Sequence, residues 1–268
     1  MSNRDIKRVV RERYGRIAVS RSGENCCATG EAGQSCCTES SAAGDGISYS
    51  MIGDAYDTVE GHEAEADLGL GCGLPTQYAA LKPGETVVDL GSGAGNDAFV
   101  ARHHVGDTGR VIGLDMTSQM VDRAQSLVRD RGYENVEFVL GDIEEMPIAS
   151  EIADIVVSNC TLNLVPDKVR AFAEMFRITK PGGRFSVSDV VTVGVLPAMI
   201  RHSAEAYVGC VAGALERDTY LGLLAQAGFV DIQVQAEREV PLPADLAGAA
   251  AEAGAGVLSI TVGGRRPE

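Results

Sequence analysis

The segment TVVDLGSGAGND, residues 86–97, constrains the fold more than any other part of the chain. Its first five residues form an apolar run typical of a buried strand, and glycines follow at positions 91, 93 and 95. Because glycine has no Cβ, these positions allow a tight turn from strand to helix and let the backbone approach a ligand closely. The N-terminus of the helix that follows from Asn96 then points at that ligand. The segment therefore predicts a ligand-binding loop beyond the carboxyl end of a strand.

Strand and helix patterns alternate downstream of this loop. We expect further strands at Arg110–Asp115, Val136–Leu140, Ala153–Ser158 and Arg184–Asp189, helices near 96–104, 118–132 (capped by Thr117 or Ser118) and 167–179, and a turn at 180–183. This alternation favours a parallel sheet with helices on both faces, and two late strand patterns can add an antiparallel edge. The expected fold class is α/β, with a doubly wound, mostly parallel, seven-stranded sheet.

The regions on either side of this core differ from it in composition. Residues 5–19 have the apolar stripe of an amphipathic helix. Residues 21–48 are rich in Gly, Ser, Thr and Ala and contain two Cys-Cys pairs, which is typical of a flexible loop. We divide the chain into residues 1–66, an N-terminal helix and Cys-rich segment; residues 67–192, a donor-binding core; and residues 193–268, C-terminal helices with the final strands.

Composition and charge limit the partners. The formal net charge is −15 and Trp is absent, so a polyphosphate would be repelled and bases would lack stacking platforms. We therefore expect a small neutral or cationic substrate and no nucleic acid. The first 19 residues lack the apolar core of a signal peptide, and the longest apolar run, 190–200, is too short to span a bilayer. We expect a cytoplasmic protein with no membrane partner, whose seven cysteines are mostly reduced.

Acidic residues follow the next two strands, where they can complete a donor site. Asp115 ends the second strand twenty residues after Gly95 and can accept hydrogen bonds from ribose hydroxyls, and Asp142 follows the third strand, where an adenine amino group would lie. The candidate cofactor-binding residues are Asp89, Gly91, Ser92, Gly93, Asp115, Met116, Asp142, Ile143 and Asn159. A dinucleotide oxidoreductase is disfavoured, because its fingerprint requires Gly or Ala where Asn96 stands. Alternatively, the glycines only permit packing and the acids only cap strand ends.

Three single cysteines lie far apart in the chain. Cys72 is flanked by glycines, Cys160 follows the fourth strand, and Cys210 lies on an apolar helical stripe. Buried cysteine often only packs, so each position also has a purely structural interpretation. The chain has no CxxC motif, and His103 and His104 are typical of a solvated helix face, so a closed zinc site is not indicated.

Six segments, taken together in this order, resemble the arsenite methyltransferase family of class I S-adenosylmethionine methyltransferases. They are LGLGCGLP, VVDLGSGAGND, GDIEEMP, SNCTLNLVPDK, KPGGRFSVSD and YVGCVAGAL, and the resemblance runs from about Asp67 to Gly228. The first, fourth and sixth are much more specific than the donor loop. The resemblance implies that Cys72, Cys160 and Cys210 bind trivalent arsenic, with Cys26, Cys27, Cys36 and Cys37 as candidate auxiliary thiols. Many relatives carry Tyr where this chain has Leu70.

The chemistry of sulfur supports this interpretation independently. Soft thiolates select soft, thiophilic ions, and arsenic held by three sulfurs keeps a lone pair that can attack an electrophilic methyl group. No general base is required, so the main task of the protein is to place the reacting atoms. The leading hypothesis is S-adenosylmethionine-dependent methylation of arsenite for detoxification (EC 2.1.1.137-like), by a monomer that uses an external thiol reductant, thioredoxin or glutathione. The alternatives are a C- or O-methyltransferase of a small metabolite and a non-catalytic thiol-based metalloid-binding protein.

Overall fold

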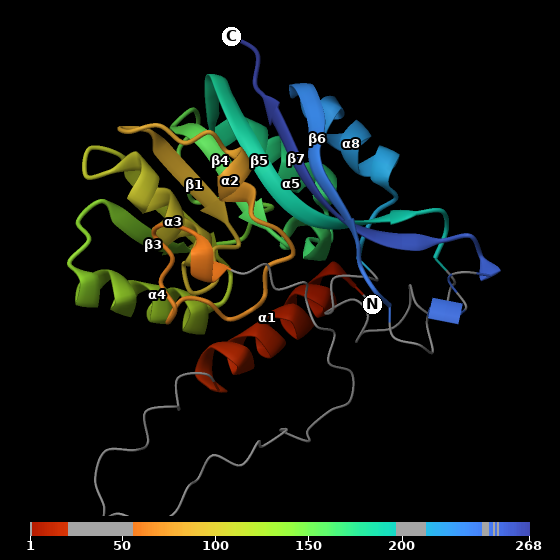
Figure 1. Cartoon of the computed structure of the whole chain (residues 1–268), viewed down its shortest axis with the longest axis horizontal. Helices are drawn as coiled ribbons and strands as arrows, with labels where there is room; N and C mark the ends of the chain where they lie inside the picture. The colour runs from red at the N-terminus through yellow and green to blue at the C-terminus, as the bar shows by residue number, and fades with distance from the viewer. Residues whose placement is uncertain (1, 21–55, 197–212, 243–246, 249, 251) are drawn as a thin grey trace, which may run out of the picture.

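The computed structural model describes residues 2–20, 56–196, 213–242, 247–248, 250 and 252–268 (Figure 1). Within them the sheet has seven strands in the order β3-β2-β1-β4-β5-β7-β6. The strands are β1 Thr86–Leu90, β2 Arg110–Asp115, β3 Val136–Leu140, β4 Ala153–Asn159, β5 Thr179–Val193, β6 Val230–Glu239 and β7 Gly256–Arg265. The first five are parallel, and β7 runs antiparallel to both β5 and β6. The predicted fold class, including its antiparallel edge, is confirmed.

Helices cover both faces of the sheet, as the strand sequences require. One face is covered by α3 (Asn96–Val105) and α4 (Ser118–Arg131), with the short α2 (Pro75–Tyr78) beside α3. The other is covered by α5 (Lys168–Ile178) and α8 (Arg217–Gln226). Consecutive residues of β1 point to opposite faces, so Val87 packs in the cluster that contains Phe99 and Val88 in the cluster that contains Phe172. Continuous apolar strands are therefore buried on both sides, which is usual for parallel sheets.

Thr117 is the N-cap residue of α4, as predicted, but its side chain makes no capping hydrogen bond. Its amide donates a 2.8 Å hydrogen bond to the carboxylate of Asp115. A second local prediction is wrong. The predicted turn at 180–183 belongs to β5, although Gly182 has a φ of +73° and the pairing of β4 with β5 shifts register there. Turn composition at the start of a strand can therefore mark an irregular strand rather than a reversal.

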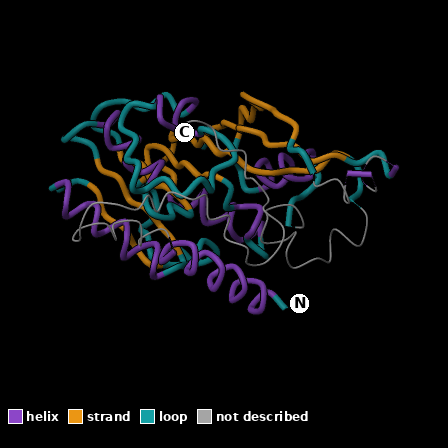
Figure 2. The backbone as a smooth tube through the Cα atoms, turned by 60° about the horizontal axis from the view of Figure 1, so that its bottom comes forward, coloured by secondary structure: helices purple, strands orange, loops and turns teal. Residues whose placement is uncertain are grey.

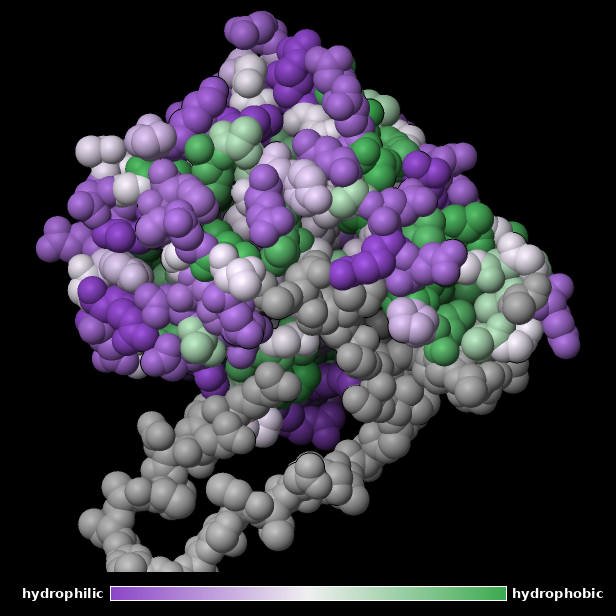
Figure 3. Space-filling view, in the orientation of Figure 1, coloured by the Kyte–Doolittle hydropathy of each residue, from purple (hydrophilic) through white to green (hydrophobic). Residues whose placement is uncertain are grey.

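The amphipathic helix predicted at the N-terminal end is α1 (Asn3–Ser20), and it lies outside the sheet layers (Figure 2). It packs on α4, where the guanidinium of Arg123 donates hydrogen bonds to the carbonyls of Ala18 and Glu65. Hydrophilic side chains predominate on the part of the surface formed by α3 and α4 (Figure 3). None of the helices in the described ranges combines the length and apolar character that a bilayer span requires. The predicted loop at 21–48 lies outside the described residues.

Candidate functional site

The glycine-rich loop joins β1 to α3, and its three glycines serve different purposes. All three have positive φ: +72° at Gly91, +53° at Gly93 and +101° at Gly95. A Cβ on Gly91 would lie 2.2 Å from side-chain atoms of Thr161, and one on Gly95 would lie 2.7 Å from the ring of Phe138. A Cβ on Gly93 would meet no heavy atom closer than 4.0 Å. Two glycines therefore permit close packing, while the third leaves its backbone open to a ligand.

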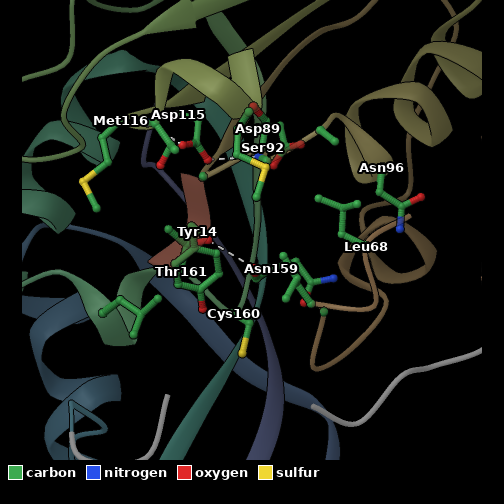
Figure 4. A pocket seen from close by; sticks show the side chains of 18 of the residues that line it. Tyr14, Leu68, Asp89, Ser92, Asn96, Asp115, Met116, Asn159, Cys160 and Thr161 are labelled. Carbon is green, nitrogen blue, oxygen red and sulfur yellow. Dashed lines mark hydrogen bonds between the residues drawn. The ribbon is translucent and has the colours of Figure 1, made fainter. Parts of the chain in front are cut away.

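A cleft opens beside this loop, at the carboxyl ends of the parallel strands. Its empty volume is about 1050 Å³, part of which is open to solvent. Every residue predicted to bind the cofactor lines it: Asp89, Gly91, Ser92, Gly93, Asp115, Met116, Asp142, Ile143 and Asn159. Cys160 lines the same cleft, at the end opposite Asp89 and Ser92, with Asn159 and Thr161 between them (Figure 4). The fold therefore brings the donor loop and one of the predicted thiols to a single cleft.

The loop end of the cleft contains buried oxygen atoms that lack a protein partner. Among the described residues, Asp89 Oδ2, Ser92 Oγ and Asn96 Oδ1 are buried and accept no hydrogen bond. A buried acceptor without a donor costs about 1–3 kcal/mol, so three of them in one cleft indicate a ligand that brings donors. S-adenosylmethionine fits this requirement, since its ammonium group and its hydroxyls are donors and its net charge is positive. These residues would hold it, and the missing Cβ of Gly93 leaves space for it to approach the loop.

Three carboxyl groups around the loop make this end of the cleft favour a cationic ligand over an anionic one. Burial raises the pKa of Asp89 well above its ordinary value, and the neighbouring Asp97 and Asp115 raise it further. Burial also raises the pKa of Asp97, to about 6, although hydrogen bonds from Asn159, Tyr56 and Thr76 oppose the shift. The pKa of Asp115 is raised by burial against backbone hydrogen bonds from Thr117 and Gly93. A cationic ligand would stabilise all three charged forms, and an anionic ligand would not.

The two predicted strand-end acids are both partly engaged by the protein. Asp115 Oδ2 accepts a hydrogen bond from the Gly93 amide at 3.0 Å, so this carboxylate also braces the donor loop. Asp142 Oδ2 lies 2.6 Å from the Nζ atom of Lys7, which lies equally close to Glu144 Oε2. A carboxylate oxygen accepts more than one hydrogen bond, so both acids can also bind a nucleoside.

Cys160, at the other end of the cleft, and Cys72, which does not line the cleft, are both buried. Cys160 is 4% exposed and Cys72 is 1% exposed, and both belong to one apolar cluster. Its other members come from α1, η2 (Leu162–Leu164), β5, β7 and the segment after β5: Val10, Leu164, Val190, Val257 and Leu196. Both thiols lie close enough to the buried hydroxyl of Tyr220 to raise its pKa, after the larger effects of burial and Asp189. Two cysteines separated by 88 positions in sequence are thus brought into one buried apolar cluster.

The backbone at Cys160 is unusual for a residue with a side chain. Its φ is +56°, in the left-handed region, and its amide donates a 2.8 Å hydrogen bond to the Ser188 carbonyl. Non-glycine residues adopt this conformation rarely and at a cost of order 1–3 kcal/mol, and such residues cluster at functional sites. Cys26, Cys27, Cys36, Cys37 and Cys210 lie outside the described residues.

Several cleft residues were not predicted from the sequence. Lys7, Val10 and Tyr14 of α1 line it, and so do Tyr56 and Asp97. The amphipathic pattern of α1 predicts a docked helix but not its site, because no local signal specifies the partner surface. Asp97 follows the donor loop directly, and its position at the start of a helix gave the only available signal.

Comparison with known proteins agrees with the geometry. Residues 81–228 match a family whose description is "Methyltransferase domain". The chain is 41% identical to an arsenite methyltransferase of Halobacterium salinarum over 238 residues, which are 88% of this chain and 60% of that protein. It is 40% identical to the human arsenite methyltransferase over 179 residues, 63% of this chain and 47% of that protein. The chain thus spans about half to three fifths of the length of these relatives.

A solved structure extends the likeness to three dimensions. The crystal structure of an arsenic(III) S-adenosylmethionine methyltransferase from Chlamydomonas reinhardtii superposes with a TM-score of 0.67 at 35% identity, covering 74% of this chain and 68% of that one. The class I methyltransferase fold expected from the motifs is therefore confirmed. The chain belongs to the methyltransferase-domain family, and the resemblance to arsenite methyltransferases that its motifs predicted is confirmed.

Proposed function

We propose that this protein transfers a methyl group from S-adenosylmethionine to trivalent arsenic held by cysteine thiolates. The observation that carries the proposal is the shared cleft, which is lined by the donor loop at one end and by Cys160 at the other, with Cys72 in the same buried apolar cluster as Cys160. The names of the relatives support the choice of acceptor. Detoxification of arsenite would be the outcome.

The donor end of the cleft would bind and orient the methyl donor. When bound, S-adenosylmethionine supplies a methyl group on a positively charged sulfur. The buried acceptors of Asp89, Ser92 and Asn96 would bind its amino acid part, while Asp115 and Asp142 would bind ribose and adenine, with Met116 and Ile143 packing on the base. Because the carboxyl groups favour a cation, release of the neutralised product would leave the site ready for a new donor.

The thiol end would hold the acceptor. Arsenite has three hydroxyl groups, and each thiol that binds arsenic replaces one of them, its proton leaving with the hydroxide as water. We propose Cys72, Cys160 and Cys210 as the ligands, with Cys26, Cys27, Cys36 or Cys37 as auxiliary thiols. The apolar walls around Cys72 and Cys160 exclude water, so the arsenic lone pair stays available. The protein then accelerates the reaction mainly by placement.

Methylation formally oxidises arsenic, so a complete cycle needs electrons. We propose that two of the cysteines form a disulfide as they return arsenic to the trivalent state, and that an external thiol reductant reduces it again, either the dithiol of thioredoxin or two molecules of glutathione. Such a reductant places the reaction in the cytoplasm, where thiols are kept reduced. A cleft built within one chain is compatible with a monomer.

The test is to follow arsenic species by mass spectrometry after incubating protein, S-adenosylmethionine, arsenite and a thiol reductant. We expect methylated arsenic from the wild type and a loss of at least a hundredfold in the Cys160→Ser variant, because oxygen does not replace a soft ligand. Calorimetry should show donor binding unchanged in the variant. Full methylation by Cys160→Ser would overturn the proposal. Arsenite binding without donor binding would instead favour a metalloid-binding protein.

A further inference from the structure

The loop that carries Cys72 has no regular secondary structure, yet hydrogen bonds fix its backbone on two sides. Asn159 Oδ1 accepts a hydrogen bond from the Cys72 amide at 3.0 Å, and Asn159 Nδ2 donates to the Gly73 carbonyl at 2.8 Å. On the other side, Ser259 Oγ donates to the Cys72 carbonyl. Two hydrogen bonds from one amide determine both the position and the orientation of the peptide groups next to Cys72.

The same amide is connected to the start of α3. Asn159 Nδ2 lies 2.7 Å from Tyr56 Oη and 3.0 Å from Asp97 Oδ2. The Tyr56 hydroxyl donates to Asp97 Oδ2 at 2.9 Å. Asp97 is two residues after Gly95, so this network joins the donor loop, the end of β4 and the Cys72 loop.

The atoms around these hydrogen bonds are closely packed. A Cβ on Gly71 would lie 2.8 Å from Asn159 Nδ2, and one on Gly73 would lie 2.6 Å from Ser188 Oγ. Gly71 and Asn159 also line the donor cleft. Because the loop and the amide are in closest contact, a displacement of Asn159 or Asp97 must move the Cys72 backbone.

We propose that Asn159, together with Tyr56 and Asp97, is a set of positioning residues that couples the donor loop to the Cys72 loop, so that a bound donor holds Cys72 in place for the acceptor. This inference rests on the proposed function, because Cys72 needs to be held in place only if it binds the acceptor. It also gives Asn159 a role beyond contact with the cofactor. Asn159 acts on the backbone of the Cys72 loop, Tyr56 and Asp97 act through the Asn159 amide, and none of the three takes part in the chemical step.

The first test measures the loop without arsenic. Cys72 is 1% exposed, so an alkylating reagent reaches it only when the loop opens. Full-length protein is treated with iodoacetamide, with and without S-adenosylhomocysteine, and alkylation of the Cys72 peptide is followed by mass spectrometry. We expect S-adenosylhomocysteine to slow this alkylation at least fivefold in the wild type. In Tyr56→Phe without ligand, Cys72 should be alkylated at least fivefold faster than in the wild type. S-adenosylhomocysteine should slow this alkylation less than twofold in the variant.

The matched control is Tyr133→Phe. Tyr133 also donates its hydroxyl to a carboxylate, Glu63 at 2.9 Å, but it does not line the cleft. Its loss should leave Cys72 alkylation and the ligand effect unchanged. If Tyr56→Phe behaves like this control, or if S-adenosylhomocysteine still protects Cys72 fully in Tyr56→Phe, the coupling is overturned. Asn159→Ala is expected to change Cys72 alkylation in the same direction as Tyr56→Phe and by a larger factor. If Asn159→Ala does not fold, Tyr56→Phe still provides the test.

The second test uses kinetics. The titratable groups that face Asp97 are Tyr56, Asp67 and Asp89, and the hydrogen bond from Tyr56 lowers the pKa of Asp97. Removal of that hydroxyl should raise this pKa, so the acidic limb of the pH profile for arsenite methylation moves to higher pH. The kcat should fall about tenfold while donor affinity changes less than threefold. An unmoved acidic limb would contradict the proposal. If the wild type methylates no arsenite but the alkylation result holds, the proposed function fails and the coupling stands.

Discussion

The two ends of the cleft differ in how they are built. The donor end has several polar groups, and one short segment, 89–97, supplies many of its residues, with strand-end acids added. The thiol end is apolar, and its residues come from α1, the Cys72 loop, the end of β4, η2, β5 and β7. A charged, hydrogen-bonding ligand can be bound by groups that lie close in sequence. A soft ion held by several sulfurs needs thiols that only the tertiary structure brings together.

The difference also affects stability. At the donor end, three carboxyl groups are buried near one another, which costs free energy until a cation binds. At the thiol end, burial of aliphatic side chains and cysteines stabilises the fold directly. The donor end is therefore the part of the site whose stability should respond most to ligand and to pH, and the predictions below test this contrast.

The largest expected effect follows from a side chain at Gly91. Gly91→Ala would put a Cβ 2.2 Å from Thr161, at a φ of +72°. We expect donor affinity to fall at least a hundredfold and the midpoint of thermal unfolding to drop. Gly132→Ala is the matched control, because Gly132 has a φ of +66° and open space around it. Calorimetry and thermal unfolding of both variants would decide, and equal effects in the two would refute a specific role for Gly91.

The next effect concerns Asp115. In Asp115→Asn, an amide group must face one of two backbone donors, Gly93 or Thr117, so one hydrogen bond becomes a repulsion. Hydrogen bonds to charged groups contribute about 1.5–3 kcal/mol, so donor affinity should fall about 10- to 100-fold. Asp154→Asn is the control, since Asp154 also accepts from a backbone amide, that of Thr86 at 2.8 Å, at the opposite end of the sheet. Undiminished affinity in Asp115→Asn would show that the ribose lies elsewhere.

A smaller effect is expected in the pH dependence of stability. The folded pKa of Asp97 is about 6, above its ordinary value of 3.8, so the folded state binds more protons between these values. The contribution of this group is fully present below about pH 4 and is lost as pH rises through about 6. Asp97→Asn should therefore flatten the fall in unfolding free energy between pH 4.5 and 7, measured by urea denaturation without ligand. Identical slopes in wild type and variant would contradict the assignment.

The smallest effect should come from Lys7. Its Nζ atom pairs with Asp142 and Glu144, and these ion pairs are partly exposed, so we expect the contribution to be about 1 kcal/mol or less. Lys7→Met should weaken donor binding no more than a few-fold and should do so less at high salt. Calorimetry at two salt concentrations would measure it. A tenfold or larger loss would show that Lys7 contacts the donor itself.

Part of the donor end of the cleft was predictable from the sequence, although Tyr56 and Asp97 were not predicted. Each predicted cofactor-binding residue lines the cleft, because glycines and acids at strand ends follow a local rule and the carboxyl ends of parallel strands meet at one edge. The roles assigned to them remain predictions. For Asn159, the structure adds hydrogen bonds to the Cys72 loop that no spacing in the sequence could indicate.

By itself, the sequence determined that the core strands are parallel, that a glycine loop follows the first of them, and that acids follow the next two. Apolar periodicity and the lack of a Cβ act over a few residues, so these features can be read locally. Only the tertiary structure decided that Cys72 joins Cys160 in one buried apolar cluster, that α1 lines the cleft with Lys7 against Asp142, and that Asn159 bonds the Cys72 loop. These contacts join residues 87 to 135 positions apart, and they form because packing and hydrogen bonding across the whole fold favour them.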